Sequence, residues 1–123
     1  MKPSFTYSAT VTKVIDGDTI DCLVDLGFNT LLKERFRLYG IDTPEKTSTD
    51  IELKVLAYEA AKLVKDSIDG KQVIIETFAK DKYGRWLAKV HLPSAEVTIN
   101  EQLIMLGLAK PYFGNNKDTL GWV

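Results

Sequence analysis

The sequence predicts a mainly-β α+β domain in which five short strands close into a small barrel and two helices pack against it. Three observations lead to this class. Five short segments are typical of strands, with the clearest alternation of apolar and polar residues at 7–14 and 19–26. From Ile51 the apolar residues recur with the period of a helix, and a capping box at Thr98 indicates a second helix. The segments follow one another as three strands, a helix, two strands and a helix. The length of 123 residues fits one domain over 1–123.

The first two strands are predicted at 7–14 and 19–26, where β-branched and apolar residues alternate with polar ones. A tight turn at Asp16-Gly17 should join them, because glycine accepts the positive φ that a short hairpin turn demands. The apolar side chains of the second strand share one face, and Asp21 and Asp25 lie on the other. That apolar face comprises Ile20, Cys22, Val24 and Leu26.

A third strand is predicted from about Lys33 to Ile41. It should end at Asp42-Thr43-Pro44, because proline has no backbone donor and restricts the residue before it. A helix follows from Ile51, with apolar residues at helical spacing. Its start has capping-box spacing from Thr49 to Glu52, and Gly70 stands where a C-terminal cap belongs.

Two more strands are predicted at 71–78 and 86–92, separated by the turn-like sequence KDKYGR. Thr98 and Glu101 form a second capping box, which opens a short helix that Gly107 should stop. Residues 108–123 are expected to form an irregular C-terminal tail. Five strands with two helices outside them favour a five-stranded OB-fold barrel.

Composition excludes several classes of protein. No apolar run approaches the roughly 18–20 residues that cross a bilayer, so a membrane protein is not expected. The first residues lack the apolar core of a signal peptide, so the cytoplasm is the expected location, or the outside of the cell if the chain is a trimmed mature form. Cys22 is the only cysteine, which excludes an intrachain disulfide.

The charge balance gives two opposite indications about nucleic acid. The net charge is −1 and the pI about 5.8, whereas nucleic-acid-binding proteins usually carry a basic excess. The segment from Lys80 to Lys89, in contrast, holds four basic residues and one acidic residue. A neutral average therefore conceals a locally basic region.

Three carboxylates are candidates for chemistry. Taken separately, each has a plain structural interpretation: Asp18 is typical of a turn, and Asp42 and Glu45 are typical of a solvent-exposed loop. If they converge, mutual repulsion of roughly 3 kcal/mol per pair at about 5 Å requires a cation. Oxygen donors favour a hard ion such as Ca²⁺ or Mg²⁺. Zn²⁺ does not fit, because His91 is the only histidine and no cysteine is near it in sequence.

Two arginines could complete such a site. Arg37 alternates with apolar neighbours and faces away from them, and Arg85 follows the basic turn. The planar guanidinium suits a two-point grip on phosphate, although each arginine alone is more commonly a salt-bridge partner. A cation with oxygen ligands, a free carboxylate and two arginines together suit phosphodiester hydrolysis.

The remaining candidates have plainer interpretations. Cys22 shares its face with apolar residues and is expected in the core, and His91 is expected on the outer face of a strand. Tyr112 and Phe113 suit either the core or the stacking of a nucleic-acid base.

Four motifs resemble the staphylococcal (micrococcal) nuclease family, in that family's order and with similar gaps. They are IDGDTI at 15–20, FRLYGIDTPE at 36–45, DKYGRWLA at 81–88 and NEQLIMLGLAKPY at 100–112. The resemblance covers about residues 11–112. It implies an OB-type barrel of five strands with packed helices. It also implies a Ca²⁺-dependent phosphodiesterase that cuts DNA and RNA and leaves 3′-phosphates and 5′-hydroxyls.

The resemblance also implies a role for each matching residue. Asp18 and Asp42 would bind calcium through their side chains, and Thr43 would bind it through its backbone carbonyl. Glu45 would orient or deprotonate the attacking water. The two arginines, Arg37 and Arg85, would hold the scissile phosphate.

Further positions match the family's contacts to substrate. Lys82 and Tyr83 would contact the neighbouring 3′-phosphate, and Tyr112 lies near the family's base-stacking tyrosine. Asp16 would stand beside the metal without binding it directly. The chain departs from the family's familiar secreted members in lacking their strong basic charge, and their longer third helix is not expected in it.

The resulting hypothesis is a metal-dependent nuclease of low sequence specificity that prefers single-stranded DNA and RNA, works as a monomer and has no membrane partner. One alternative is a non-catalytic OB-fold module that binds single-stranded nucleic acid. Another is a scaffold domain with no nucleic-acid role.

Overall fold

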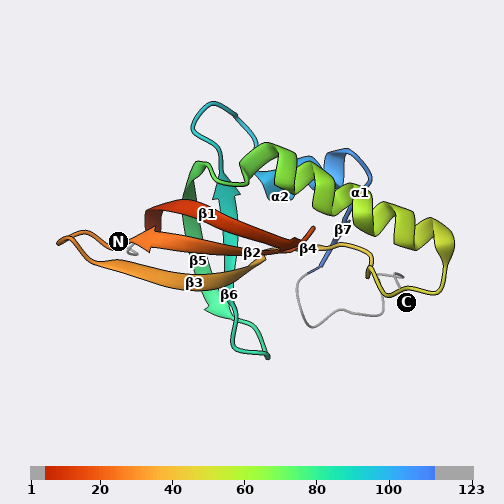
Figure 1. Ribbon diagram of the computed structural model, residues 1–123, viewed down its shortest axis with the longest axis horizontal. Coiled ribbons are helices and arrows are strands. Elements are labelled where there is room, and N and C mark those ends of the chain that lie inside the picture. Colours follow the sequence, from red (N-terminus) through yellow and green to blue (C-terminus); the bar gives the residue numbers. More distant parts are fainter. Residues whose placement is uncertain (1–4, 113–123) are drawn as a thin grey trace.

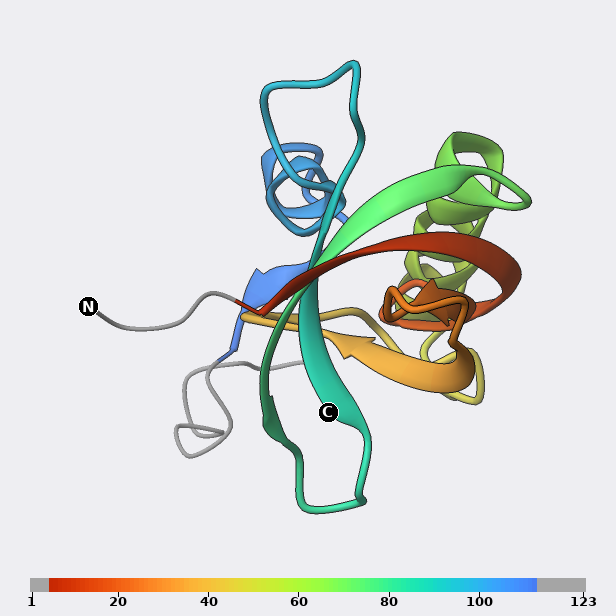
Figure 2. The ribbon, with the colours of Figure 1, turned by 90° about the vertical axis from the view of Figure 1, so that its left-hand side faces the viewer.

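The computed structural model describes residues 5–112, and five strands of this range form a closed barrel in the order β1-β2-β3-β6-β5. The strands are β1 (Thr6–Asp16), β2 (Thr19–Asp25), β3 (Leu31–Leu38), β5 (Gln72–Lys80) and β6 (Trp86–His91). Neighbours are antiparallel except β3 and β6, which run parallel. Figures 1 and 2 show the strands curving round the barrel. The predicted OB-like α+β fold is confirmed.

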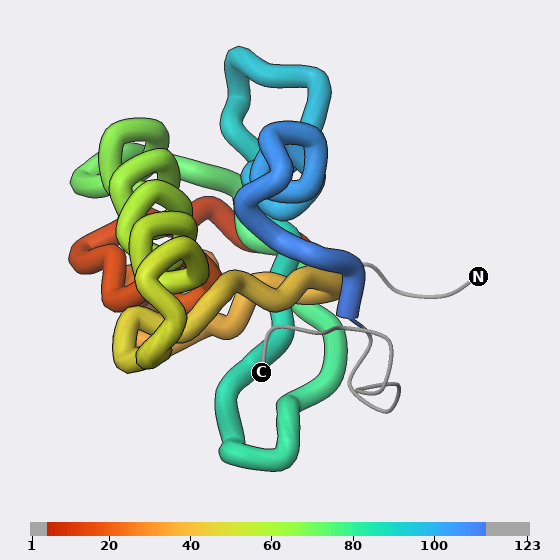
Figure 3. The backbone as a smooth tube through the Cα atoms, turned by 90° about the vertical axis from the view of Figure 1, so that its right-hand side faces the viewer, coloured from red at the N-terminus to blue at the C-terminus, as the bar shows by residue number. Residues whose placement is uncertain are grey.

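The two helices of the described range are α1 (Ile51–Ile68) and α2 (Ile99–Met105). α1 lies across the barrel against β1, and α2 lies against β6 (Figures 1 and 3). α1 buries Ala57, Ala60 and Val64 of the apolar stripe expected from sequence, together with Ile68. Leu53 and Leu56, which also belong to the expected stripe, are half-buried. Of the helices in residues 5–112, none is long and apolar enough to cross a membrane. The core lies inside the barrel and beneath these helices.

A second sheet joins the middle of the chain to its C-terminal part. β4 (Ile41–Asp42) pairs antiparallel with β7 (Lys110–Pro111), and the Tyr112 amide donates to the Gly40 carbonyl at 2.9 Å. The predicted third strand therefore divides in two at Gly40, which has a φ of 78°. The tail expected to be irregular from residue 108 contributes this short strand. Residues 113–123, including Phe113, lie outside the described range.

The caps of the helices agree with the sequence except at the start of α1. The Asp50 carboxylate accepts from the amides of Glu52 and Leu53, so Asp50 is the N-cap, and the capping box predicted at Thr49 is wrong. The carboxylate one residue later reaches the same free amides. The second capping box, Thr98 with Glu101, is confirmed.

The hairpin turn at Asp16-Gly17 is confirmed, but its predicted reason is wrong. Asp16 pairs with Thr19 across the β1–β2 hairpin, and Gly17 has no positive φ. A Cβ placed on Gly17 would lie 2.7 Å from the Ala60 Cβ and 3.1 Å from Cγ2 of Thr43. Glycine is required because α1 and the loop after β4 pack directly onto this turn.

Candidate active site

The β1–β2 turn positions Asp18. Its backbone carbonyl accepts from the Leu38 amide at 2.8 Å, which fixes the turn to the end of β3. The Thr19 hydroxyl donates to Oδ1 of Asp18 at 3.1 Å, and the Thr43 amide donates to Oδ2 at 3.4 Å. Both carboxylate oxygens are thus oriented by neighbours from different segments.

Arg37 is the centre of the group. Its Nη1 donates to the carbonyls of Leu38 at 3.0 Å and Ile41 at 2.9 Å. Its Nη2 lies 3.1 Å from Oδ1 of Asp42 and 3.5 Å from Oδ2 of Asp18. One guanidinium therefore joins the two predicted metal ligands, and only 12% of its side chain is exposed.

Tyr112 belongs to the same group. Its ring centroid lies 5.8 Å from the guanidinium carbon of Arg37. The β4–β7 pairing explains this position, because it sets the residue after β7 beside Gly40 and the end of β3. The aromatic residue predicted to contact substrate is thus brought to the arginine predicted to hold phosphate.

The carboxylates of the site affect one another electrostatically. Burial raises the pKa of Asp42 to about 6, and Arg37 opposes that rise. The negative charges of Asp18 and Glu45 raise the pKa further, so the three predicted carboxylates lie within electrostatic reach. Within residues 5–112, however, no three acidic, histidine or cysteine side chains are close enough together to form a metal cluster.

The donor set nevertheless suits a hard cation. Asp18 and Asp42 each place a carboxylate oxygen within 3.5 Å of Nη2 of Arg37. Thr43, which follows Asp42 and donates its amide to Asp18, is buried, with 5% of the residue exposed. Carboxylate and carbonyl oxygens are the ligands that Ca²⁺ takes, with water completing its shell. A cation here would also offset the repulsion that raises the pKa of Asp42.

Glu45 begins the exposed part of the loop after β4. Thr43 and Pro44 are buried, whereas Glu45 is exposed. Its carbonyl accepts from the Ser48 amide at 3.1 Å, which closes a turn. Lys46 connects this turn to the barrel, because its Nζ donates to the carbonyl of Ile15 at 3.0 Å. Sequence reasoning missed Lys46, because no residue pattern indicates a lysine that donates to a backbone carbonyl.

The turn between β5 and β6 carries the second group of predicted residues, and it projects away from the helices (Figures 1 and 2). Lys82 and Tyr83 are exposed there. Nε of Arg85 lies 2.9 Å from Oδ2 of Asp81, and the guanidinium carbon lies 5.5 Å from the Tyr83 ring centroid. Arg85 is therefore held by its own turn.

Asp81 organises that turn, and sequence reasoning missed it too. Its Oδ1 accepts from the amides of Tyr83 at 2.8 Å and Arg85 at 2.9 Å. Burial alone would raise the pKa of Asp81, but these amides and the Arg85 guanidinium lower it overall. An aspartate followed four residues later by an arginine, with a glycine between them, is the signal that could have identified it.

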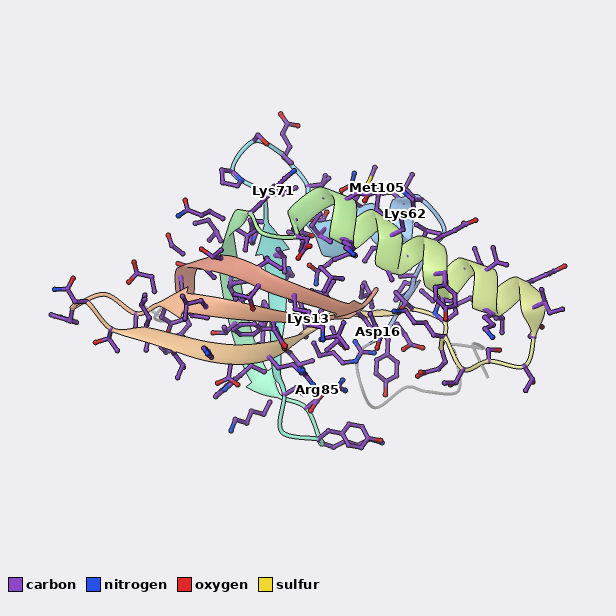
Figure 4. The ribbon with its side chains drawn as sticks, in the orientation of Figure 1. Lys13, Asp16, Lys62, Lys71, Arg85 and Met105 are labelled. Carbon is purple, nitrogen blue, oxygen red and sulfur yellow. The ribbon has the colours of Figure 1, made fainter. Side chains whose placement is uncertain are left out.

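The barrel register relates the two arginines. Arg37 of β3 pairs with Leu87 of β6, and Arg85 comes two residues before Leu87. Arg85 itself lies in the turn just before β6, whose first residue, Trp86, pairs with Phe36 next to Arg37. Figure 4 shows Arg85 where the hairpin turn meets the start of β6, and Asp16 at the end of β1.

The residues predicted to be structural behave as expected. Cys22 is buried in the core, and burial raises the pKa of its thiol to about 12, with a further contribution from Asp21. His91 lies on the outer face of β6, where Nε2 is 3.1 Å from Oε1 of Glu76. Asp16, predicted beside the metal, pairs with Lys46 at 3.3 Å.

Comparisons with known proteins agree on one family. The family model described as staphylococcal nuclease homologue matches residues 35–120. An uncharacterized protein of Methanocaldococcus jannaschii is 34% identical over 131 residues, covering 89% of this chain and 61% of its own length. A protein of Escherichia coli O157:H7 named an uncharacterized endonuclease is 32% identical, covering 88% of this chain and 63% of its own.

A protein of Staphylococcus intermedius named thermonuclease is 36% identical over 105 residues, covering 84% of this chain and 58% of its own length. This chain thus spans about three fifths of the length of the curated relatives that it matches.

Proposed function

Since this chain belongs to the staphylococcal nuclease family, we propose that it is a Ca²⁺-dependent phosphodiesterase of low sequence specificity, which hydrolyses DNA and RNA and leaves 3′-phosphate and 5′-hydroxyl ends. One observation carries the proposal. The guanidinium of Arg37 holds Asp18 and Asp42 together beside Tyr112, which combines a phosphate ligand, two oxygen donors for a cation and an aromatic surface for a base.

The cation would be held by Asp18, Asp42 and the carbonyl of Thr43. When bound, Ca²⁺ would polarise a phosphoryl oxygen and offset the charge of the carboxylates. The pKa of Asp42 is raised by burial and by two neighbouring negative charges although Arg37 lowers it, and this supports the assignment, because a further positive charge would make the ionised carboxylate less costly.

The protein's own residues divide the remaining work. Arg37 and Arg85 bind the non-bridging oxygens of the phosphate and offset the charge that builds up on them. Glu45, which is exposed, takes a proton from water as the water oxygen bonds to phosphorus. The bond from phosphorus to the 5′-oxygen breaks on the opposite side, that oxygen takes a proton from solvent as it leaves, and Glu45 returns its proton to solvent.

The substrate is held on either side of the cleaved bond. Lys82 and Tyr83 lie exposed on the turn next to Arg85 and would contact the neighbouring 3′-phosphate. Tyr112 would stack on a base, which every nucleotide permits, so sequence specificity is low. A flat base face is accessible in a single strand, and we therefore propose that single-stranded DNA and RNA are preferred.

End-group analysis tests this proposal. The protein is incubated with a single-stranded DNA oligonucleotide and Ca²⁺, with and without excess chelator, and the new ends are identified. We expect 5′-hydroxyl products that disappear with chelator. Glu45→Gln should slow the reaction by orders of magnitude at nearly unchanged affinity, whereas Lys62→Met, in an exposed ion pair with Asp66, serves as the matched control. Equal rates with and without free metal would refute it.

A non-catalytic OB-fold module that binds single strands is the second candidate. Cations lie over aromatic rings of the β5–β6 hairpin, which is a surface that suits stacked bases and phosphates. The pairs are Lys80 with Trp86, Lys82 with Tyr83, Arg85 with Tyr83, and Lys89 with Phe78. A pure binding module would release no products and would bind equally well after Glu45→Gln.

A further inference from the structure

We propose that Lys46 is a positioning residue that holds Glu45 at the candidate active site, an inference that rests on the proposed function. Nζ of Lys46 donates to the carbonyl of Ile15 at 3.0 Å and lies 3.3 Å from Oδ1 of Asp16. The same nitrogen lies 5.5 Å from the ring centroid of Tyr58 on α1. One ammonium group thus joins the loop to the end of β1 and to the helix.

Glu45 stands between two fixed points. On one side, Thr43 is buried, its amide donates to Asp18, and its methyl group packs against Gly17. On the other side, Lys46 is anchored to Ile15. The only exposed residue between these anchors is Glu45, so the residues on both sides of it are bonded to the hairpin that carries Asp18, Thr43 through its amide and Lys46 through its side chain.

Lys46 also places a positive charge against Asp16. The Asp16 side chain is 45% exposed, and its turn carries Asp18 two residues later. Without the ammonium group, Asp16 would lose the positive charge that stands 3.3 Å from its carboxylate. The two effects of Lys46, holding the loop and pairing Asp16, can be separated, because Asp16→Asn removes the ion pair and leaves the bond to Ile15.

The first test is a double-mutant cycle with Glu45. Lys46→Met keeps the apolar stem and removes the ammonium group. We expect kcat on single-stranded DNA to fall about 10- to 100-fold with KM changed less than about threefold, since a misplacement near 1 Å costs that much. In the presence of Glu45→Gln, Lys46→Met should cost less than about threefold more. Lys46→Arg should restore most of the activity, and Lys62→Met should change nothing.

An equal loss of kcat in both backgrounds would overturn the proposal, because Lys46 would then act independently of Glu45. A rise in KM without a fall in kcat would overturn it as well, because that pattern indicates direct binding of substrate.

The second test needs no activity. Amide hydrogen exchange is measured in the metal-free protein for Thr43 and Ser48, whose amides donate to Asp18 and Glu45. Lys46→Met should speed the exchange of both amides about tenfold or more relative to the unchanged protein and to Lys62→Met. Unchanged exchange would refute the tether. If the protein cuts no nucleic acid, the proposed function fails, and this measurement still decides whether Lys46 holds the loop.

Discussion

Gly17→Ala is the sharpest test of how α1 and the site are joined. The new methyl carbon would lie 2.7 Å from the Ala60 Cβ and 3.1 Å from Cγ2 of Thr43. Ordinary carbon contacts are about 3.5–4.0 Å, so the turn and the helix must separate by roughly 1 Å. All three nearest atoms are backbone or Cβ atoms or a methyl group of packed residues, so no flexible side chain can move aside.

Two effects of opposite sign set the magnitude. Overpacking costs about 1–3 kcal/mol. Replacing glycine by alanine where φ is compatible gains about 0.4–1 kcal/mol by restricting the unfolded chain, and Gly17 has no positive φ to forbid it. We therefore expect a net loss of about 1–2 kcal/mol in the free energy of unfolding, measured by urea denaturation. Because Asp18 is the next residue, hydrolysis should also fall about 10- to 100-fold.

Ala60→Gly supplies the control, since it removes the methyl group that Gly17→Ala would meet. Alone it should cost about 1 kcal/mol as a glycine in a helix. Combined with Gly17→Ala it should cost clearly less, giving a coupling energy of about 1 kcal/mol. Gly84→Ala, where φ is 83° and space is open, should be destabilising without any relief from Ala60→Gly. Full additivity of Gly17→Ala and Ala60→Gly would refute the steric argument.

Three further predictions concern groups whose burial or pairing is unusual. The lowered pKa of Asp81 contributes stability that is present above its ordinary pKa of 3.8 and is lost as pH falls through the lower folded value. Asp81→Asn should therefore cost about 1 kcal/mol at pH 7 and progressively less as pH falls below 3.8, measured by denaturation at each pH. The Cys22 thiol is buried and its pKa is raised to about 12, so at pH 8 it should react with a disulfide reagent only as fast as the protein unfolds. Prompt reaction of the native protein would contradict this burial. Asn100 accepts from the Val90 amide and donates to the carbonyls of Tyr39 and Ala88. Asn100→Leu should therefore lower the free energy of unfolding, measured by urea denaturation, by about 3 kcal/mol or more, and a loss under about 1 kcal/mol would contradict that network.

The barrel strands could be predicted from sequence because the alternation of buried and exposed side chains along a strand does not depend on which strand it pairs with. The β4–β7 pairing could not, because two-residue strands have no period and their partners are some seventy residues apart along the chain. The cap of α1 was ambiguous for a local reason. Thr49 and Asp50 both precede the apolar stripe and both can accept from a first-turn amide, and only the backbone path decides between them.

The site residues were predictable as residue types and not as contacts. Asp18, Asp42 and Arg37 were all identified, yet the sequence treated Arg37 as a ligand of phosphate, whereas its guanidinium also joins the two carboxylates. Lys46 was missed because it acts through a backbone carbonyl, which leaves no trace in the residue pattern. Asp81 was missed because its two bonds to backbone amides are indicated only by the glycine and the arginine that follow it. Gly17 was identified for the wrong property, since its missing side chain and not its φ is what the fold uses.

The net charge of −1 is a poor guide to substrate class because the structure pairs acids with bases locally. Several aspartates of the barrel and its turns are matched by a nearby cation, and their charges largely cancel at a distance. These pairs are Asp16 with Lys46, Asp21 with Arg35, Asp18 and Asp42 with Arg37, and Asp81 with Arg85. On the β5–β6 hairpin, by contrast, Lys80, Lys82 and Lys89 lie over aromatic rings, and none of the three forms an ion pair within residues 5–112. A polyanion approaching this hairpin therefore meets a positive surface that the overall count conceals.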